Sequence, residues 1–260
     1  DLQKDKANII IEKEGQNIAL SANLVLAADG THSTVRSLLN FETDTTDYQQ
    51  KAIVAPVTLQ RNHHHIAYER FLNDGAIAML PLKNETPACA MIWTAANNQI
   101  DNLMSLSDSE FLKILQKQFG YRLGKLINIE QRATFPLHFI HVKNPIKDNV
   151  ILIGNAAHTI HPVAAQGLNL ALYEIAHITQ VLLENHKEEQ PLIKGLSEKL
   201  PKLQPKTNLM FSHYLNPLFS SNWFAINAAK QAGMMILDLC PPLKNKLSRM
   251  LAMEKVRWLK

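Results

Sequence analysis

Residues 149–176 (NVILIGNAAHTIHPVAAQGLNLALYEIA) constrain the fold more than any other stretch of this 260-residue chain. Residues 150–153 form an apolar run, which predicts a short buried strand. The run ends at Gly154, where the backbone can turn sharply and another molecule can approach closely. A second glycine, Gly167, opens a predicted helix. The apolar positions of this helix recur at helical spacing and are Leu168, Leu172, Ile175 and Leu182.

The loop between this strand and this helix has the character of a ligand site. Free backbone N–H groups and the positive end of a helix dipole lie just beyond the end of a buried strand. This arrangement favours phosphates and other electron-rich groups. Pro162 stiffens the connection. We therefore predict that residues 154–169 hold a ligand.

Residues 27–36 (AADGTHSTVR) follow a second short apolar run, which is suited to burial in a mostly parallel sheet. The run stops at Asp29 and Gly30, and Ser33 can cap the short helix that follows, which contains Arg36. Alone, the aspartate would be a plain turn residue and the arginine a solvated helix charge. Because the chain also contains the loop at residues 154–169, we favour a role in ligand binding for both Asp29 and Arg36.

The two segments resemble the motifs with which flavin-dependent aromatic hydroxylases grip FAD. GNAAHTIHPVAAQGLN resembles the pattern G-D-A-A-H-x-x-x-P-x-x-G-Q-G-x-N, and ADGTHSTVR resembles A-D-G-x-x-S-x-V-R. Asn155 stands in place of the usual Asp, and in this respect the loop most resembles that of the ubiquinone-biosynthesis hydroxylases, which act on polyprenyl phenols. The resemblance implies a mixed α/β fold: part of a Rossmann-like FAD/NAD(P)-binding domain, an antiparallel-sheet substrate domain and C-terminal helices.

The resemblance also implies which residues contact the cofactor. By it, Asp29 and Gly30 approach the FAD pyrophosphate, Arg36 braces the motif, and Asn155 meets the ribityl chain. Ala165 replaces the first Gly of the G-Q-G pattern and leaves less room for close backbone approach. No residue stands out as a catalytic base. The implied cofactor-binding residues are Asp29, Gly30, Arg36, Gly154, Asn155, Ala156, Ala157, His158, Pro162, Gln166, Gly167 and Asn169.

Glycine placement indicates that the main dinucleotide turn is missing. None of the nine glycines lies two positions from another, so no G-x-G-x-x-G turn is present. Members of the resembled family carry that turn well before the Asp-Gly motif. We therefore expect this chain to correspond to the latter two-thirds of a flavoprotein that hydroxylates a polyprenyl phenol with FAD, NAD(P)H and O₂. Alone, it is expected to be inactive and without flavin.

Residues 41–135 show a different pattern, in which strands follow one another through short turns. Such strands pair antiparallel, in a sheet distinct from the flavin side. Ser107 and Glu110 form a capping box for a helix that runs to Gly120. A further hairpin is expected around Gly15. The predicted strands in this region are residues 51–59, 66–72, 76–80 and 88–95.

The chain therefore divides into four expected segments. Residues 1–40 and 136–195 belong to the FAD-binding domain, residues 41–135 form the antiparallel substrate domain, and residues 196–260 form a C-terminal helical segment. Apolar residues make up 46% of the chain and charged residues 19%, which excludes disorder as the main state.

Composition also bounds compartment and partners. Two cysteines cannot build a disulfide framework, which favours a reducing, cytoplasmic location. No run of about 18 apolar residues predicts a membrane-spanning helix. The modest net charge of +4 argues against nucleic acid as the main partner. Residues 243–260 nevertheless carry six basic residues and one acidic residue. Either they form a docked helix with a solvated basic face, or they contact the inner membrane surface peripherally.

Three consecutive histidines, His63, His64 and His65, do not predict a metal site. Adjacent strand residues point to opposite faces, so at most two of them could converge. No Cys or carboxylate at ligand spacing accompanies them. His158 and His161 lie in the loop whose sequence is already accounted for by the resemblance to the flavin-binding motif. No metal ligand is therefore predicted.

Two other functions remain open at this level. The chain could be a non-catalytic module that binds a quinone-like lipid or partner proteins, whereas the hydroxylase is expected to have a ubiquinone-biosynthesis protein complex as a partner. The chain could also belong to a flavoprotein hydroxylase or halogenase with another aromatic substrate. A G-x-G-x-x-G unit encoded before Asp1 would favour the enzyme over the module, and product analysis separates the substrates.

Overall fold

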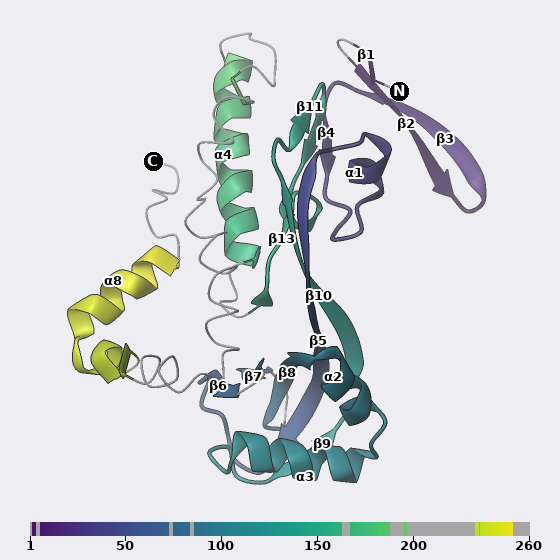
Figure 1. The fold of residues 1–260 in the computed structure, drawn as a ribbon. Helices are drawn as coiled ribbons and strands as arrows, with labels where there is room; N and C mark the ends of the chain where they lie inside the picture. The colour runs from purple at the N-terminus through teal and green to yellow at the C-terminus, as the bar shows by residue number, and fades with distance from the viewer. Residues whose placement is uncertain are drawn as a thin grey trace. The chain divides into compact units, whose positions relative to one another are not determined.

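The structure is a computed structural model, drawn in Figure 1, and confirms the predicted mixed α/β class. It describes residues 2–3, 6–72, 75–83, 86–162, 167–187, 195–196, 232–233 and 235–251. The chain divides into two compact units. The first comprises Asp1–Thr46, His138–His213 and Leu237–Lys260, and the second comprises Asp47–Leu137 and Tyr214–Ile236.

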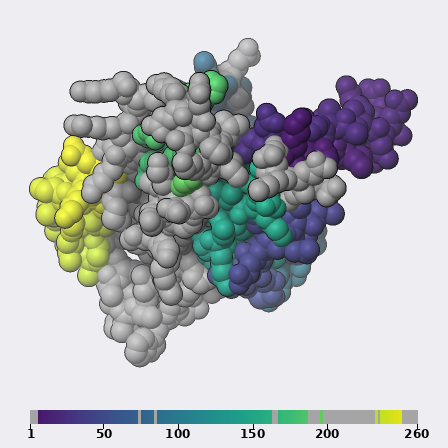
Figure 2. Space-filling view, turned by 90° about the horizontal axis from the view of Figure 1, so that it is seen from above, coloured from purple at the N-terminus to yellow at the C-terminus, as the bar shows by residue number. Residues whose placement is uncertain are grey.

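The first unit begins with a three-stranded antiparallel sheet of order β1-β2-β3. Its strands are β1 (Leu2–Gln3), β2 (Lys6–Lys13) and β3 (Gln16–Ala22). Glu14 and Gly15 both adopt positive φ, at 54° and 77°, so the predicted hairpin turn at Gly15 is confirmed. Figure 2 shows this sheet in purple. Its exposed apolar side chains are Ile10, Ile11, Ile18 and Leu20.

A second small sheet brings the two motif segments together. It has the order β11-β12-β4, with β11 at Ile146–Lys147, β12 at Val150–Leu152 and β4 at Val25–Ala27. The two predicted apolar strands are thus confirmed as β4 and β12, and they pair in parallel. Because parallel strands end at the same edge of a sheet, the residues that follow each strand meet there.

Helix α4 (Gly167–Lys187) begins at the predicted glycine, but most of the apolar residues counted in the sequence do not face the core. Leu168 is 70% exposed, and Leu172 and Ile175 are exposed as well. The buried stripe lies on another side of the helix, where Ile178 and Val181 pack against β11 and β12. Its members are spaced by three or four residues and are Leu170, Glu174, Ile178, Val181 and Asn185.

The second unit contains most of a seven-stranded sheet that follows the order β13-β10-β5-β8-β7-β6, with β9 paired to β5. The predicted strands are confirmed, although β5 already begins at Thr43. The sequence predicted only its second half, residues 51–59, because the first half is polar and gives no hydrophobic signal. The strands are β5 (Thr43–Leu59), β6 (Tyr68–Leu72), β7 (Gly75–Pro81), β8 (Ala88–Ala96), β9 (Leu126–Ile129), β10 (Ala133–Val142) and β13 (His158–Thr159).

Two helices cover one face of this sheet, α2 (Asn97–Met104) and α3 (Asp108–Phe119). The capping box of α3 is confirmed. Helix α2 was not predicted, and its N-cap Ala96 provides no side-chain cap that would have marked its start. Inward residues alternate along each strand and meet the helices in one core, whose largest members include Ile53, Ile77, Met91, Trp93, Phe111 and Leu115.

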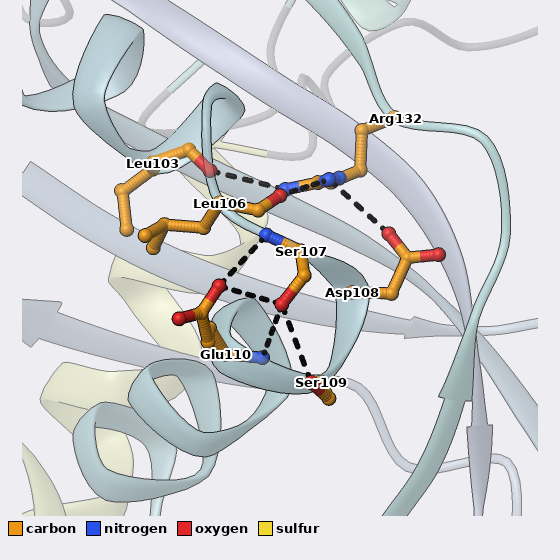
Figure 3. A network of polar contacts seen from close by, with 7 residues as sticks. All are labelled: Leu103, Leu106, Ser107, Asp108, Ser109, Glu110 and Arg132. Carbon is orange, nitrogen blue, oxygen red and sulfur yellow. Dashed lines mark hydrogen bonds and ion pairs between the residues drawn. The ribbon is translucent and has the colours of Figure 1, made fainter.

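Arg132 fastens the two helices to the loop between β9 and β10, as Figure 3 shows. Its guanidinium donates to the carbonyl oxygens of Leu103 at 3.0 Å and Leu106 at 2.7 Å. It also lies 3.1 Å from a carboxylate oxygen of Asp108 and 4.9 Å from the ring centroid of Phe111. These contacts fix the end of α2 and the start of α3 against the sheet.

Candidate functional site

The two predicted motif loops meet at one edge of the β11-β12-β4 sheet. The segment after β4 contains Asp29 and Gly30, and the segment after β12 opens with a short 3₁₀ turn at Gly154–Ala156. Arg36 joins them, although it lies 120 residues from the turn. Its guanidinium donates to the carbonyl oxygen of Ala156 at 2.9 Å and to that of Thr31 at 2.6 Å.

Two threonines add a second link between the loops. The Thr159 hydroxyl lies 3.3 Å from the Thr31 hydroxyl and donates to the carbonyl oxygen of Asn155 at 3.2 Å. Sequence reasoning missed both threonines, because they occupy variable positions of the two motif patterns. No local signal marks them, because their contact joins residues that lie 128 apart in the chain.

Substituting Arg36 by Met is expected to destabilise the first unit by about 3 kcal/mol, because two part-buried carbonyl groups lose a charge-assisted hydrogen bond. Urea unfolding measures the change, and hydrogen exchange at residues 154–157 localises it. Arg61→Met, at an exposed arginine, is the matched control and should change stability little. Equal losses in both variants would contradict a bridging role for Arg36.

The two loop glycines have different roles. Gly154 adopts a φ of +57°, and a Cβ placed on it would lie 3.7 Å from Cβ of Ala171 on α4, in ordinary contact. Its glycine character therefore serves the backbone turn. Gly30 adopts a φ of +86° with no heavy atom within 4 Å of such a Cβ. The backbone of Gly30 thus borders open space.

Asp29 is exposed, and its carboxylate accepts a hydrogen bond from the Val35 N–H at 3.1 Å. Partial burial raises its pKa, but hydrogen bonds from the Ser33 hydroxyl and from backbone N–H groups outweigh this effect and lower it below the usual value. Ser33 also caps α1 (Thr34–Leu38), as predicted. Asp29 is therefore an ionised group at the start of this helix.

His158 and Glu174 form a buried polar contact behind the turn. Their side chains are 1% and 4% exposed, and the imidazole Nδ1 lies 3.3 Å from the carboxylate Oε2. The two atoms are within ion-pair distance but are not aligned as a hydrogen bond. Burial, reinforced by His141, lowers the pKa of His158 to about 4, so the imidazole is neutral at pH 7. Burial likewise lowers the pKa of His161 to about 4.

The other predicted site residues fall into two groups. Asn155 and Asn169 are exposed, and Asn169 and Gly167 belong to the first turn of α4. Ala156 and Ala157 are buried in the turn, and Pro162 is half-buried. Gln166 lies outside the described residues, as does Ala165. Within the described ranges, His, Cys, Asp and Glu side chains form no group of three that could hold a metal ion.

Glu174 was not singled out from the sequence. Its signal is its position in the four-residue spacing that links Leu170, Glu174 and Ile178. A carboxylate at an inward helix position needs a polar partner in the core. The histidine of the adjacent loop lies within ion-pair distance of this carboxylate.

Comparison with known proteins identifies the family of the chain. The family described as FAD binding domain matches residues 1–192. An uncharacterised protein of Synechocystis is 30% identical over 247 residues, which cover 94% of this chain and 59% of that protein. The ubiquinone hydroxylase UbiL of Rhodospirillum rubrum is 29% identical over 240 residues, which cover 91% of this chain and 55% of UbiL. The chain thus spans less than two thirds of either relative.

A solved structure shows the same fold. The aromatic hydroxylase CabE from angucycline biosynthesis superposes with a TM-score of 0.71 at 17% identity, covering all of this chain and 52% of CabE. The family match spans both motif loops and the sheet edge where Arg36 joins them. The chain belongs to the FAD-binding-domain family.

Proposed function

We propose that this chain supplies the flavin loop and the substrate sheet of an FAD-dependent monooxygenase that hydroxylates a polyprenyl phenol in ubiquinone biosynthesis. The observation that carries the proposal is the Arg36 bridge, which holds the Asp-Gly segment and the turn at Gly154–Ala156 at one sheet edge. Similarity to UbiL, a ubiquinone hydroxylase, supports the substrate class. NAD(P)H is the proposed electron donor.

The residues present fit FAD. Gly30 has open space beside its Cα, so a pyrophosphate can approach its backbone N–H. Asp29 and Asn155 are exposed polar groups that suit sugar or ribityl hydroxyls, and a carboxylate is better matched to a hydroxyl than to a phosphate. The start of α4, with Gly167 and Asn169, offers the positive end of a 21-residue helix.

The chemistry divides between cofactor and protein. When bound and reduced, FAD activates O₂ and supplies the hydroxyl group to an electron-rich ring. The residues of this chain bind and orient the cofactor, and the positive end of α4 favours negative charge near the loop. Asn155 can hydrogen-bond a hydroxyl but lacks the charge of the usual Asp, which should weaken its contribution.

The sheet of the second unit suits an apolar aromatic substrate. Residues on its face away from α2 and α3 are mostly small or apolar and only partly buried. They include Val54, Pro56, Ala78, Leu80, Ala90 and Ile92. Such a face gives an aromatic ring and an isoprenoid tail contact area without charge. On this proposal, residues 41–135 form the substrate domain and residues 1–40 and 136–195 the cofactor side.

The test is to express the chain together with an in-frame upstream segment that carries a G-x-G-x-x-G unit. Bound flavin should then appear in the absorbance spectrum, and NAD(P)H with a polyprenyl phenol should give a ring-hydroxylated product. A colourless protein that gains no FAD on titration would contradict the cofactor assignment. Flavin binding with a halogenated or epoxidised product would overturn only the reaction.

The proposal extends to a peripheral membrane contact through α8 (Pro241–Leu251). None of the described helices is long and apolar enough to cross a bilayer. Figure 2 shows α8 in yellow at the surface. Leu239 and Leu243 expose apolar side chains beside Lys244, Lys246 and Arg249. The remaining charges of residues 252–260 lie outside the described residues.

Removal of the chain after Pro242 is therefore expected to abolish sedimentation with anionic liposomes at low salt. Each basic residue near an anionic leaflet contributes about 1 kcal/mol, and salt attenuates this contribution. The intact chain should pellet at low salt and be released at high salt. Neutral liposomes serve as the control. Equal pelleting of both forms would leave α8 as a helix with a solvated basic face.

A further inference from the structure

The buried contact between His158 and Glu174 connects the two sides of the loop. His158 begins β13 and is separated from the turn at Gly154–Ala156 by Ala157, and Glu174 belongs to α4. Strand β13 pairs with β10, where His141 stands opposite His158. The turn is therefore held from one side by β10 and faces α4 on the other.

We propose that His158 is a positioning residue whose Nδ1–H donates to the Glu174 carboxylate and fastens the turn at Gly154–Ala156 to helix α4. Only the consequence for flavin rests on the proposed function. The contact itself is a property of this chain. In this role His158 positions the cofactor loop through α4 and does not itself contact the cofactor.

Burial makes this hydrogen bond favourable. Both imidazole nitrogens of His158 are buried without a hydrogen bond. A buried donor without an acceptor is destabilising, because it has lost its hydrogen bonds to water and has gained none in the protein. The Glu174 oxygen at 3.3 Å is within reach after a small rotation of the ring. Neutral imidazole carries one N–H, so a bond to the carboxylate selects the Nδ1–H tautomer.

The titratable groups around His158 lie on β10, on α4 and in the loop itself. His141 faces His158 from β10, Glu174 faces it from α4, and His161 lies buried further along the same loop. Burial is the main cause that lowers the pKa of His158, and the electrostatic effect of His141 adds to it. A neutral imidazole that donates to the carboxylate hydrogen-bonds to α4 without adding a positive charge beside His141.

The packing of the loop depends on this contact. Ala157 N–H donates to the carbonyl oxygen of Gly154 at 2.9 Å, and Val142 N–H donates to that of Ala157 at 2.9 Å. Gly154 itself packs near Ala171, one turn before Glu174 on the same helix. A second attachment at Glu174 prevents the turn from sliding along α4, which would move Asn155 and the Arg36 contact with it.

The tautomer of His158 tests the proposal without flavin. Side-chain ¹⁵N NMR of the intact chain, assigned with His158→Gln, should show a protonated Nδ1 and an unprotonated Nε2. Glu174→Gln keeps an acceptor oxygen and should preserve this spectrum. Glu174→Leu continues the apolar stripe of Leu170 and Ile178, so it should fold while losing the Nδ1–H signal. A protonated Nε2 in the unmodified chain overturns the proposal.

Hydrogen exchange supplies the second readout. With Glu174→Leu, the Ala157 amide should exchange at least about tenfold faster, because the turn opens locally, whereas Glu174→Gln should match the unmodified chain. Asn185→Leu, a polar-to-apolar change on the same buried stripe, is the matched control and should leave Ala157 unchanged. Unchanged exchange in Glu174→Leu also overturns the proposal. Because FAD is absent, neither result depends on whether the proposed function holds.

Discussion

Lowering the pH from 7 to 4 is expected to destabilise the first unit by about 6 kcal/mol, with most of the loss below pH 6.5. His158 and His161 each have a pKa lowered by burial to about 4, from an ordinary value of 6.5. Between these values the unfolded chain binds more protons than the folded chain, so stability falls with pH. Each shift corresponds to about 3 kcal/mol.

Other groups contribute outside this window or with opposite sign. Asp29, whose pKa is lowered from 3.8, loses its contribution only below about pH 4. Burial raises the pKa of Glu69 above 4.5, so that carboxyl favours the folded state slightly as the pH falls. Glu69 belongs to the second unit, so this effect does not offset that of the two histidines on the first unit.

Urea unfolding at a series of pH values, followed by hydrogen exchange in β12 and α4, measures the loss in the first unit. Replacing both buried histidines by Gln should remove most of the slope between pH 4 and 6.5. Replacing His32 and His186, which are exposed, by Gln is the matched control and should leave the slope of stability against pH unchanged. A flat profile in the unmodified chain would show that the two imidazoles are hydrated.

Local signals predicted most of the elements. Strand β12 and the start of α4 follow from an apolar run bounded by Gly154 and from Gly167. The capping box at Ser107 marks α3 because two side-chain contacts close its first turn. The parallel pairing of β4 with β12 was not predicted, and it is this pairing that joins the two motif loops at a common edge.

The missed features depend on tertiary context. Leu168 and Leu172 have helical spacing but are exposed, because the side of α4 that faces β11 and β12 carries Glu174 within its apolar stripe. A search for apolar residues at helical spacing does not count a carboxylate, and nothing in the local pattern shows that His158 lies within ion-pair distance of it. The Thr159–Thr31 contact likewise joins residues 128 apart, and no local pattern predicts it.

Titration of the 260-residue chain with FAD is expected to give a dissociation constant above about 1 mM, roughly a thousandfold weaker than a micromolar site. The chain contains no G-x-G-x-x-G turn, so the backbone N–H groups that cradle the pyrophosphate in such folds are not available from it. Each charge-assisted hydrogen bond lost weakens binding by about 1.5–3 kcal/mol. The open backbone at Gly30 and the start of α4 remain, and they provide only part of that cradle.

Isothermal titration calorimetry and quenching of flavin fluorescence measure this affinity, with FMN as the control ligand. FMN lacks the adenosine and the second phosphate. Equal, weak binding of FAD and FMN would therefore show that the loop at residues 154–169 contacts only the flavin end. Appending an upstream G-x-G-x-x-G unit should restore micromolar affinity for FAD but should not raise the affinity for FMN to the same level, because the restored N–H groups bind the pyrophosphate. Micromolar affinity for FAD in the 260-residue chain itself would mean that the Arg36-braced edge alone suffices to hold the cofactor.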